Sequence, residues 1–153
     1  MNLALTRSRF QANAVATAGP HRILTMLYDR LVLDIDRAQA AQRAGNDREA
    51  TEALDHAYAI VSGLASTLDV ATWSGGRALM DLYLYLLHEL LGCSIAGDAD
   101  RTAACGALVT PLRDAWHEAA ATVVADAVAL IPTARTPPDA FGEPAASSEL
   151  GVG

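Results

Sequence analysis

The chain has 153 residues and a net charge of −7, and all eleven of its basic residues are arginine. This length suits one domain with a core of its own, and an acidic chain without a basic cluster is a poor candidate for binding nucleic acid or an anionic membrane. No apolar run reaches the roughly 20 residues that cross a bilayer, and the N-terminus lacks a secretory signal, so we expect a cytoplasmic protein without membrane insertion.

The first predicted helix covers residues 20–44. Pro20 suits the first turn of a helix, and Gly45 follows the last periodic residue. Apolar residues occupy more than one face of this segment, among them Ile23, Met26 and Leu27. The preceding residues 1–19 are mixed and polar, and we expect a flexible N-terminal segment there.

The second predicted helix starts at a capping residue, Asn46 or Asp47, and runs to about Asp69. Its main apolar residues are spaced three and four apart and form a single seam: Leu54, Ala57, Val61, Leu64 and Leu68. The opposite side is polar. A bundle core is enough to explain this pattern.

The third predicted helix follows the TWSGG stretch (72–76) and runs from Arg77 to about Ile95. Its polar side chains are predicted to form one narrow stripe, made of Arg77, Asp81, His88 and Glu89. The remaining circumference is apolar, more than one seam requires. The excess predicts a second covered face, which a partner, a second copy of the chain or the N-terminal segment could cover. The alternative is an unusually buried central helix of the bundle.

The fourth predicted helix begins near Asp100, after a turn at Gly97–Asp98, and continues to about Leu130. Pro111 falls inside it and removes a backbone donor, so we expect a kink or a split near residues 109–111. The segment 132–153 is rich in Pro, Gly, Ala and Ser, a composition typical of a disordered tail.

These four helices predict an all-α fold, an antiparallel up-down four-helix bundle over residues 20–131. The flexible segment 1–19 would precede the bundle and the disordered tail 132–153 would follow it.

Chemistry-bearing motifs are sparse, so we predict no metal, no cofactor and no enzymatic activity. Asp114-x-x-His117 has the spacing of di-iron bundles, but those need two such motifs and two further carboxylates. His56 could be read as a phosphotransfer histidine, but the residues typical of that site do not surround it. Cys93 and Cys105 lie in apolar surroundings and are predicted to be buried, reduced thiols.

Four blocks of the sequence together resemble the flagellar secretion chaperone FliS family. They are FQANAVATAGPHRILTMLYDRL (10–31), AGNDREATEALDHAYAIVSGLASTLD (44–69), SGGRALMDLYLYLLHELL (74–91) and PLRDAWHEA (111–119). The resemblance implies a cytosolic chaperone that binds the C-terminal segment of flagellin, prevents its premature polymerisation and aids its export. The alternative is an unrelated helical adaptor, or a self-associating bundle in which the apolar excess forms a homodimer.

The candidate residues for a flagellin groove come from the first three predicted helices: Ile23, Met26, Leu27, Ile60, Leu64, Tyr83, Tyr85 and Leu86. For each of them an ordinary core position is the alternative. Tyr83 and Tyr85 cannot face the same way in a helix, so at most one belongs to a partner face.

Phe10 and Val15 are candidates for a removable cover of the groove. Phe10 also stands where the family usually has a tyrosine linked with docking to the export gate component FlhA. The resemblance therefore implies FlhA as a second partner, with a contact at Phe10 that lacks the hydroxyl.

Overall fold

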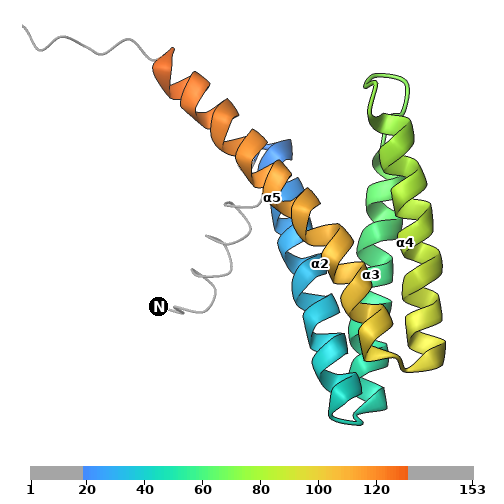
Figure 1. Cartoon of the computed structure of the whole chain (residues 1–153). Helices are drawn as coiled ribbons and strands as arrows, with labels where there is room; N and C mark the ends of the chain where they lie inside the picture. Colours follow the sequence, from blue (N-terminus) through green and yellow to red (C-terminus); the bar gives the residue numbers. More distant parts are fainter. Residues whose placement is uncertain (1–18, 131–153) are drawn as a thin grey trace, which may run out of the picture.

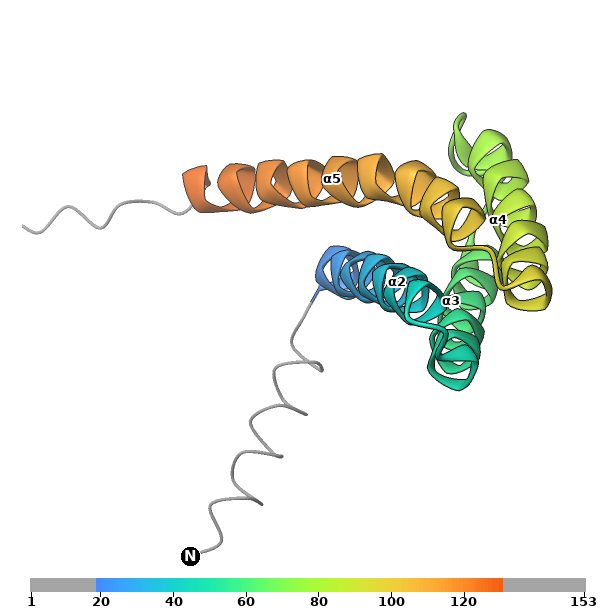
Figure 2. The ribbon, with the colours of Figure 1, turned by 60° about the horizontal axis from the view of Figure 1, so that its bottom comes forward.

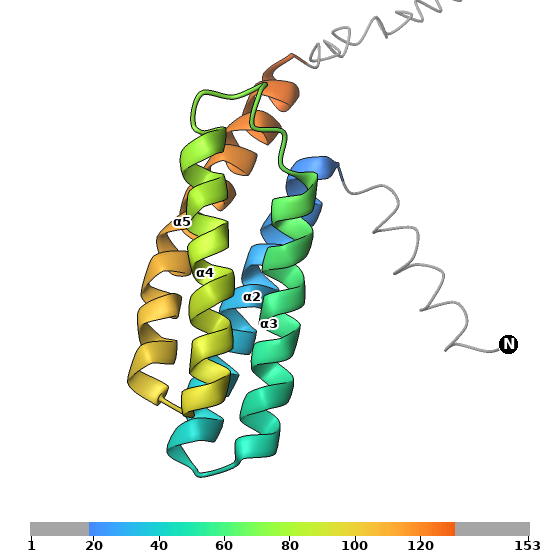
Figure 3. The ribbon, with the colours of Figure 1, turned by 90° about the vertical axis from the view of Figure 1, so that its right-hand side faces the viewer.

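A computed structural model describes residues 19–130 as four helices: α2 (Pro20–Arg43), α3 (Asp47–Thr67), α4 (Gly76–Ala96) and α5 (Ala99–Ala129) (Figure 1). Each helix packs on the next one along the chain, and α5 packs back on α2, so the helices form a closed ring. Successive helices run antiparallel (Figure 3). The predicted all-α, up-down four-helix bundle is confirmed, and the predicted helix ends agree with the observed ones to within two residues.

Side-chain and glycine caps set the helix boundaries. Asn46 caps α3, because its side chain accepts a hydrogen bond from the Glu49 N–H and donates one to the Glu49 carboxylate. Asp98 caps α5 by accepting from two backbone N–H groups of its first turn. Gly97 ends α4 at a φ of 62°, a left-handed conformation that favours glycine.

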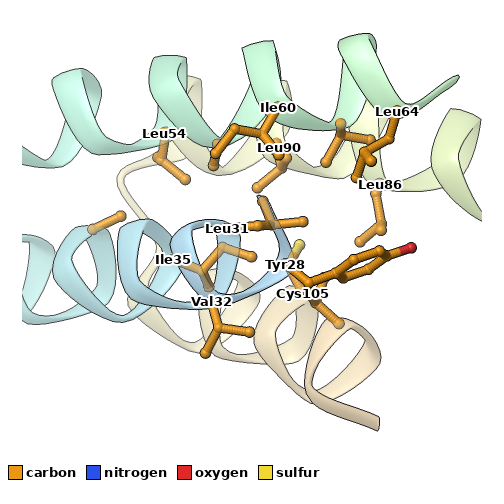
Figure 4. Close-up of a cluster of buried hydrophobic side chains, with 14 of the residues drawn as sticks. Tyr28, Leu31, Val32, Ile35, Leu54, Ile60, Leu64, Leu86, Leu90 and Cys105 are labelled. Atoms are coloured by element: carbon orange, nitrogen blue, oxygen red, sulfur yellow. The ribbon is translucent and has the colours of Figure 1, made fainter. Parts of the chain in front are cut away.

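The core lies along the axis of the bundle. Its largest fully buried side chains come from all four helices and include Tyr28, Leu31 and Ile35 of α2, Leu54 and Val61 of α3, Leu86 and Leu90 of α4, and Val109 of α5 (Figure 4). The predicted seam of α3 is buried as expected, with Leu68 at its end half-buried.

Pro111 does not split α5, which is one continuous helix. Figure 2 shows instead that α5 bends between its yellow first part and its orange second part. A proline inside a helix deprives one carbonyl of its partner and its ring presses on the preceding turn, which bends the helix. The predicted kink in α5 is therefore confirmed, and the alternative prediction of a split helix is wrong.

One end of the bundle is wider than the other. The α4–α5 contact is the smallest between neighbouring helices, and the two helices diverge away from the turn that joins them (Figure 1). We call the wide end, where α2 and α4 begin and α3 ends, the open end. Beyond it α5 continues, and all of its residues 121–130 are exposed.

Candidate partner-binding surfaces

Helix α4 is apolar but poorly covered. Among the residues described, it is the one helix long and apolar enough to cross a bilayer by length and composition, a test that core helices of soluble proteins also pass. Only 28% of its most apolar 18-residue window is buried in the bundle. A core helix would be mostly buried, so α4 keeps apolar surface that its own neighbours do not cover.

The exposed apolar residues of α4 share a face with its polar ones. Leu84, Leu91 and Ile95 are exposed, and they alternate along one face with the exposed Arg77, Asp81 and His88. The predicted polar stripe is therefore confirmed in part. Arg77, Asp81 and His88 are exposed on this face, but exposed apolar residues lie between them. Glu89 does not belong to the stripe: it is partly buried toward α5 and pairs there with Arg101.

A cleft of about 310 Å³ opens at the open end of the bundle. Its apolar walls come from all four helices and from the α3–α4 loop: Leu24, Leu64, Leu68, Trp73, Leu79, Tyr83 and Trp116. The half-exposed Trp73 lies at its edge, with its ring centroid 6.5 Å from that of Trp116. We call this the open-end cleft, and its few polar groups suit an apolar side chain as occupant.

A pair of buried tyrosines lies under the open-end cleft. The hydroxyl oxygens of Tyr28 and Tyr83 are 2.5 Å apart and hydrogen-bond across the core between α2 and α4. Burial, the largest cause, raises the pKa of both phenols above the ordinary value near 10. Both groups therefore stay protonated in the folded protein at pH values where they ionise in the unfolded chain.

Replacing one of these tyrosines is expected to flatten the alkaline pH dependence of stability. Above about pH 10 the unfolded chain releases phenolic protons that the folded chain keeps, so the free energy of unfolding falls by about 1.4 kcal/mol per pH unit for each tyrosine. Below that pH the contribution is fully present. Urea unfolding of Tyr83→Phe between pH 9 and pH 11 should show a shallower fall than the wild-type protein; equal slopes would contradict the shifted pKa.

The predicted groove residues divide into two groups. Four are core side chains, namely Ile60, Leu64, Tyr83 and Leu86, since each is buried among the other helices (Figure 4 labels Ile60, Leu64 and Leu86). Ile23, Met26 and Tyr85 are exposed and Leu27 is partly buried. Tyr83 and Tyr85 face opposite ways, as their spacing predicts. Phe10 and Val15 lie outside the described residues.

The accessible candidates do not form one continuous patch. Ile23, Met26 and Leu27 belong to α2 and Tyr85 belongs to α4, two helices that face each other across the core and are not neighbours in the ring. A partner that contacts both groups must therefore pass around the bundle.

A buried carboxylate joins α2 to α3, and the sequence patterns did not reveal it. The Asp34 side chain is only 2% exposed and accepts two hydrogen bonds of 3.1 Å from the Arg30 guanidinium. His56 of α3 contacts the same carboxylate through Nδ1. The His56 side chain is half-exposed, because it pairs with Asp34. The sequence did hold one signal for this buried carboxylate: Asp34 is an acidic residue at a position where the helical period predicts a core side chain.

The apolar seam of α5 runs on past the open end. Trp116 and Ala120 are partly buried, and the same face continues into Val123 and Ala127, which are exposed. Val124 and Val128, beside this face, are exposed as well. The periodicity of α5 gives no sign of this change, since the exposure depends on where the neighbouring helices begin.

Within residues 19–130 no group of three or more histidine, cysteine or acidic side chains could hold a metal ion. Asp114 and His117, which have the spacing found in di-iron bundles, have different partners. His117 hydrogen-bonds to Asp29 of α2 at 2.8 Å, and Asp114 pairs with Arg113.

Comparison with known proteins gives one family. The sequence profile of the family described as "Flagellar protein FliS" matches residues 3–123. A protein named "Flagellar secretion chaperone FliS" from Salmonella typhimurium (strain LT2) is 30% identical over 110 residues, which cover 69% of this chain and 80% of that protein. The protein of the same name from Escherichia coli (strain K12) is 28% identical over 108 residues, 69% of this chain and 79% of its own length.

Proposed function

Since this chain belongs to the FliS family of flagellar proteins, we propose that it is a cytosolic export chaperone that binds the C-terminal segment of flagellin. Its relatives are named flagellar secretion chaperones, so a role in flagellar export follows from the family. We further propose that flagellin is the client that this chain binds. Covering that segment would prevent premature polymerisation and keep the subunit ready for export.

The observation that carries this proposal is the poor burial of α4, the most apolar helix. Only 28% of its most apolar 18-residue window is buried in the bundle. An amphipathic client helix laid on such a surface buries apolar area on both sides. The ordering cost of a disordered client offsets part of that gain, so affinity has to come from a large contact. Accessible apolar residues on both α2 and α4 fit a client that wraps around the bundle.

Calorimetry with a peptide of the flagellin C-terminal segment tests the proposal. We expect a complex with a Kd of about 1 μM or tighter, because a wrapped segment buries more surface than a single helix. A negative heat-capacity change should accompany binding, as apolar burial requires. No heat of binding at high concentration would contradict flagellin as the client.

The N-terminal residues 1–17 are proposed to cover part of the client surface until the client arrives. The described chain begins at Gly19, and Leu24, five residues further on, lines the open-end cleft, so the cleft lies close to the residue at which this segment joins the bundle. Deleting residues 1–17 should tighten binding of the flagellin peptide, because the client no longer competes with a cover. Unchanged affinity in the same titration would count against this role.

We also propose two further partners. One is FlhA at the export gate, because Phe10 stands where the family usually has a tyrosine linked with docking there. A second copy of the chain on the α4 face would produce a homodimer, and sedimentation of the free protein and of its peptide complex distinguishes a dimer from a client-bound monomer.

A further inference from the structure

The two cysteines of the chain lie side by side in the core. Cys93 is in the last turn of α4 and Cys105 in the second turn of α5, and both are free thiols, 0% and 2% exposed. Their Sγ atoms are 4.0 Å apart across the α4–α5 turn. A disulfide needs about 2.0 Å between the sulfur atoms, so the two have to approach each other by about 2 Å.

Burial keeps this pair reduced and slow to react. It raises the pKa of Cys105 to about 12, and the positive charge of Arg101 nearby offsets only part of this effect. The thiolate is the reactive form, so few molecules carry it at neutral pH while the bundle is closed. Oxidation therefore depends on an opening of the structure around the pair.

The ion pair between Glu89 of α4 and Arg101 of α5 lies next to the cysteines. Two hydrogen bonds of 2.8 and 3.0 Å join these side chains. The guanidinium rests against Gly92, the residue before Cys93, since a Cβ at this position would be 2.5 Å from Nη2. Glycine at 92 thus leaves room for the Arg101 guanidinium, which connects α4 and α5 through Glu89.

We propose that Cys93 and Cys105 are a redox-modification site, at which a peroxide converts the two thiols into an intramolecular disulfide between α4 and α5. One thiolate attacks a peroxide oxygen, the O–O bond breaks, and the departing oxygen leaves as water after taking up a proton. The resulting sulfenic acid is attacked by the second thiol, the S–O bond breaks, and a second water leaves. Two thiols lose two electrons, and hydrogen peroxide is reduced to two molecules of water.

The disulfide would hold α4 and α5 together near the turn that joins them. These two helices share the smallest contact between neighbours in the bundle. These helices diverge toward the open end, where the open-end cleft lies, so the bond restrains the turn about which they separate. The proposed disulfide lies in the described core of the chain, and its formation does not depend on which client the chain binds.

Intact-mass analysis of the full chain after hydrogen peroxide treatment tests the site. Because the sequence has only two cysteines, a monomer that loses two hydrogen atoms and resists alkylation after unfolding must contain the Cys93–Cys105 bond. We expect this product, its reversal by dithiothreitol, and a rise in Tm of about 5–10 °C in the oxidised form. Oxygen adducts on single cysteines, covalent dimers or an unfolded oxidised chain would each overturn the proposal.

Two arginine variants test the role of the ion pair. Arg101→Met removes the ion pair, and the more frequent opening of the two helices should speed disulfide formation about tenfold, although the thiols also lose a positive charge that favours the thiolate. Arg113→Met is the matched control, since Arg113 pairs with the exposed Asp114 on the same helix, and should oxidise at the wild-type rate. Circular dichroism first confirms that both variants are folded, and Glu89→Gln replaces Arg101→Met if the latter is not. Equal rates in the folded Arg101 or Glu89 variant and the control would overturn the part assigned to the ion pair.

Discussion

Leu86→Ala is expected to lower the free energy of unfolding by about 3 kcal/mol, because it leaves a cavity in a closed core. Leu86 is 1% exposed and lies among core side chains from the other helices. Urea unfolding followed by circular dichroism measures the change. The loss should appear as a lower midpoint with an unchanged m value.

The adjacent Tyr85→Ala is the matched variant, since Tyr85 is 52% exposed on the same helix. Its effect on the free energy of unfolding should stay below about 1 kcal/mol, because a surface truncation leaves no cavity. Binding of the flagellin peptide should weaken about tenfold, as expected for the loss of an aromatic anchor. A stable Leu86→Ala protein that no longer binds peptide would show that Leu86 belongs to the groove and would contradict its assignment to the core.

The double variant Arg30→Met/His56→Leu is expected to destabilise the bundle by about 3 kcal/mol at neutral pH. Both partners of Asp34 are then gone, and a carboxylate that is 2% exposed remains without a counter-charge. Each partner is itself about half-exposed and can be hydrated when Asp34 is removed. The cost therefore lies mainly in the unpaired carboxylate.

Adding Asp34→Leu to the double variant tests this explanation. The triple variant should regain most of the lost free energy of unfolding, since an apolar side chain needs no partner at a buried position. Arg48→Met serves as a control, because Arg48 pairs with Glu52 on an exposed surface and should contribute little. A triple variant as unstable as the double variant would show that the loss comes from packing of Arg30 or His56.

Local signals in the sequence were enough for the helices and the fold class. Pro20, Asn46, Gly97 and Asp98 act within one turn of the chain, so the helix ends follow from neighbouring residues alone. The single seam of α3 likewise fixes which side faces the core. Family membership was also within reach, since the four resembling blocks fall inside the matched region 3–123.

The candidate site needed the tertiary structure, because exposure depends on what the other helices cover. Periodicity showed that α4 has excess apolar surface, but it could not show which flanks of the helix are covered: Tyr85 is exposed, whereas Leu87 is partly buried. That division depends on where α3 and α5 lie beside α4.

The sequence by itself thus determined the four helices and their order, since both rest on short-range capping and spacing, and it showed the family through the four resembling blocks. Only the tertiary structure decided that Asp34 is buried against His56, that Cys93 faces Cys105, and that the last turns of α5 are exposed beyond the other three described helices. These features depend on contacts between segments far apart in the chain or on where neighbouring helices begin. No local pattern of residues encodes the distance between two helices.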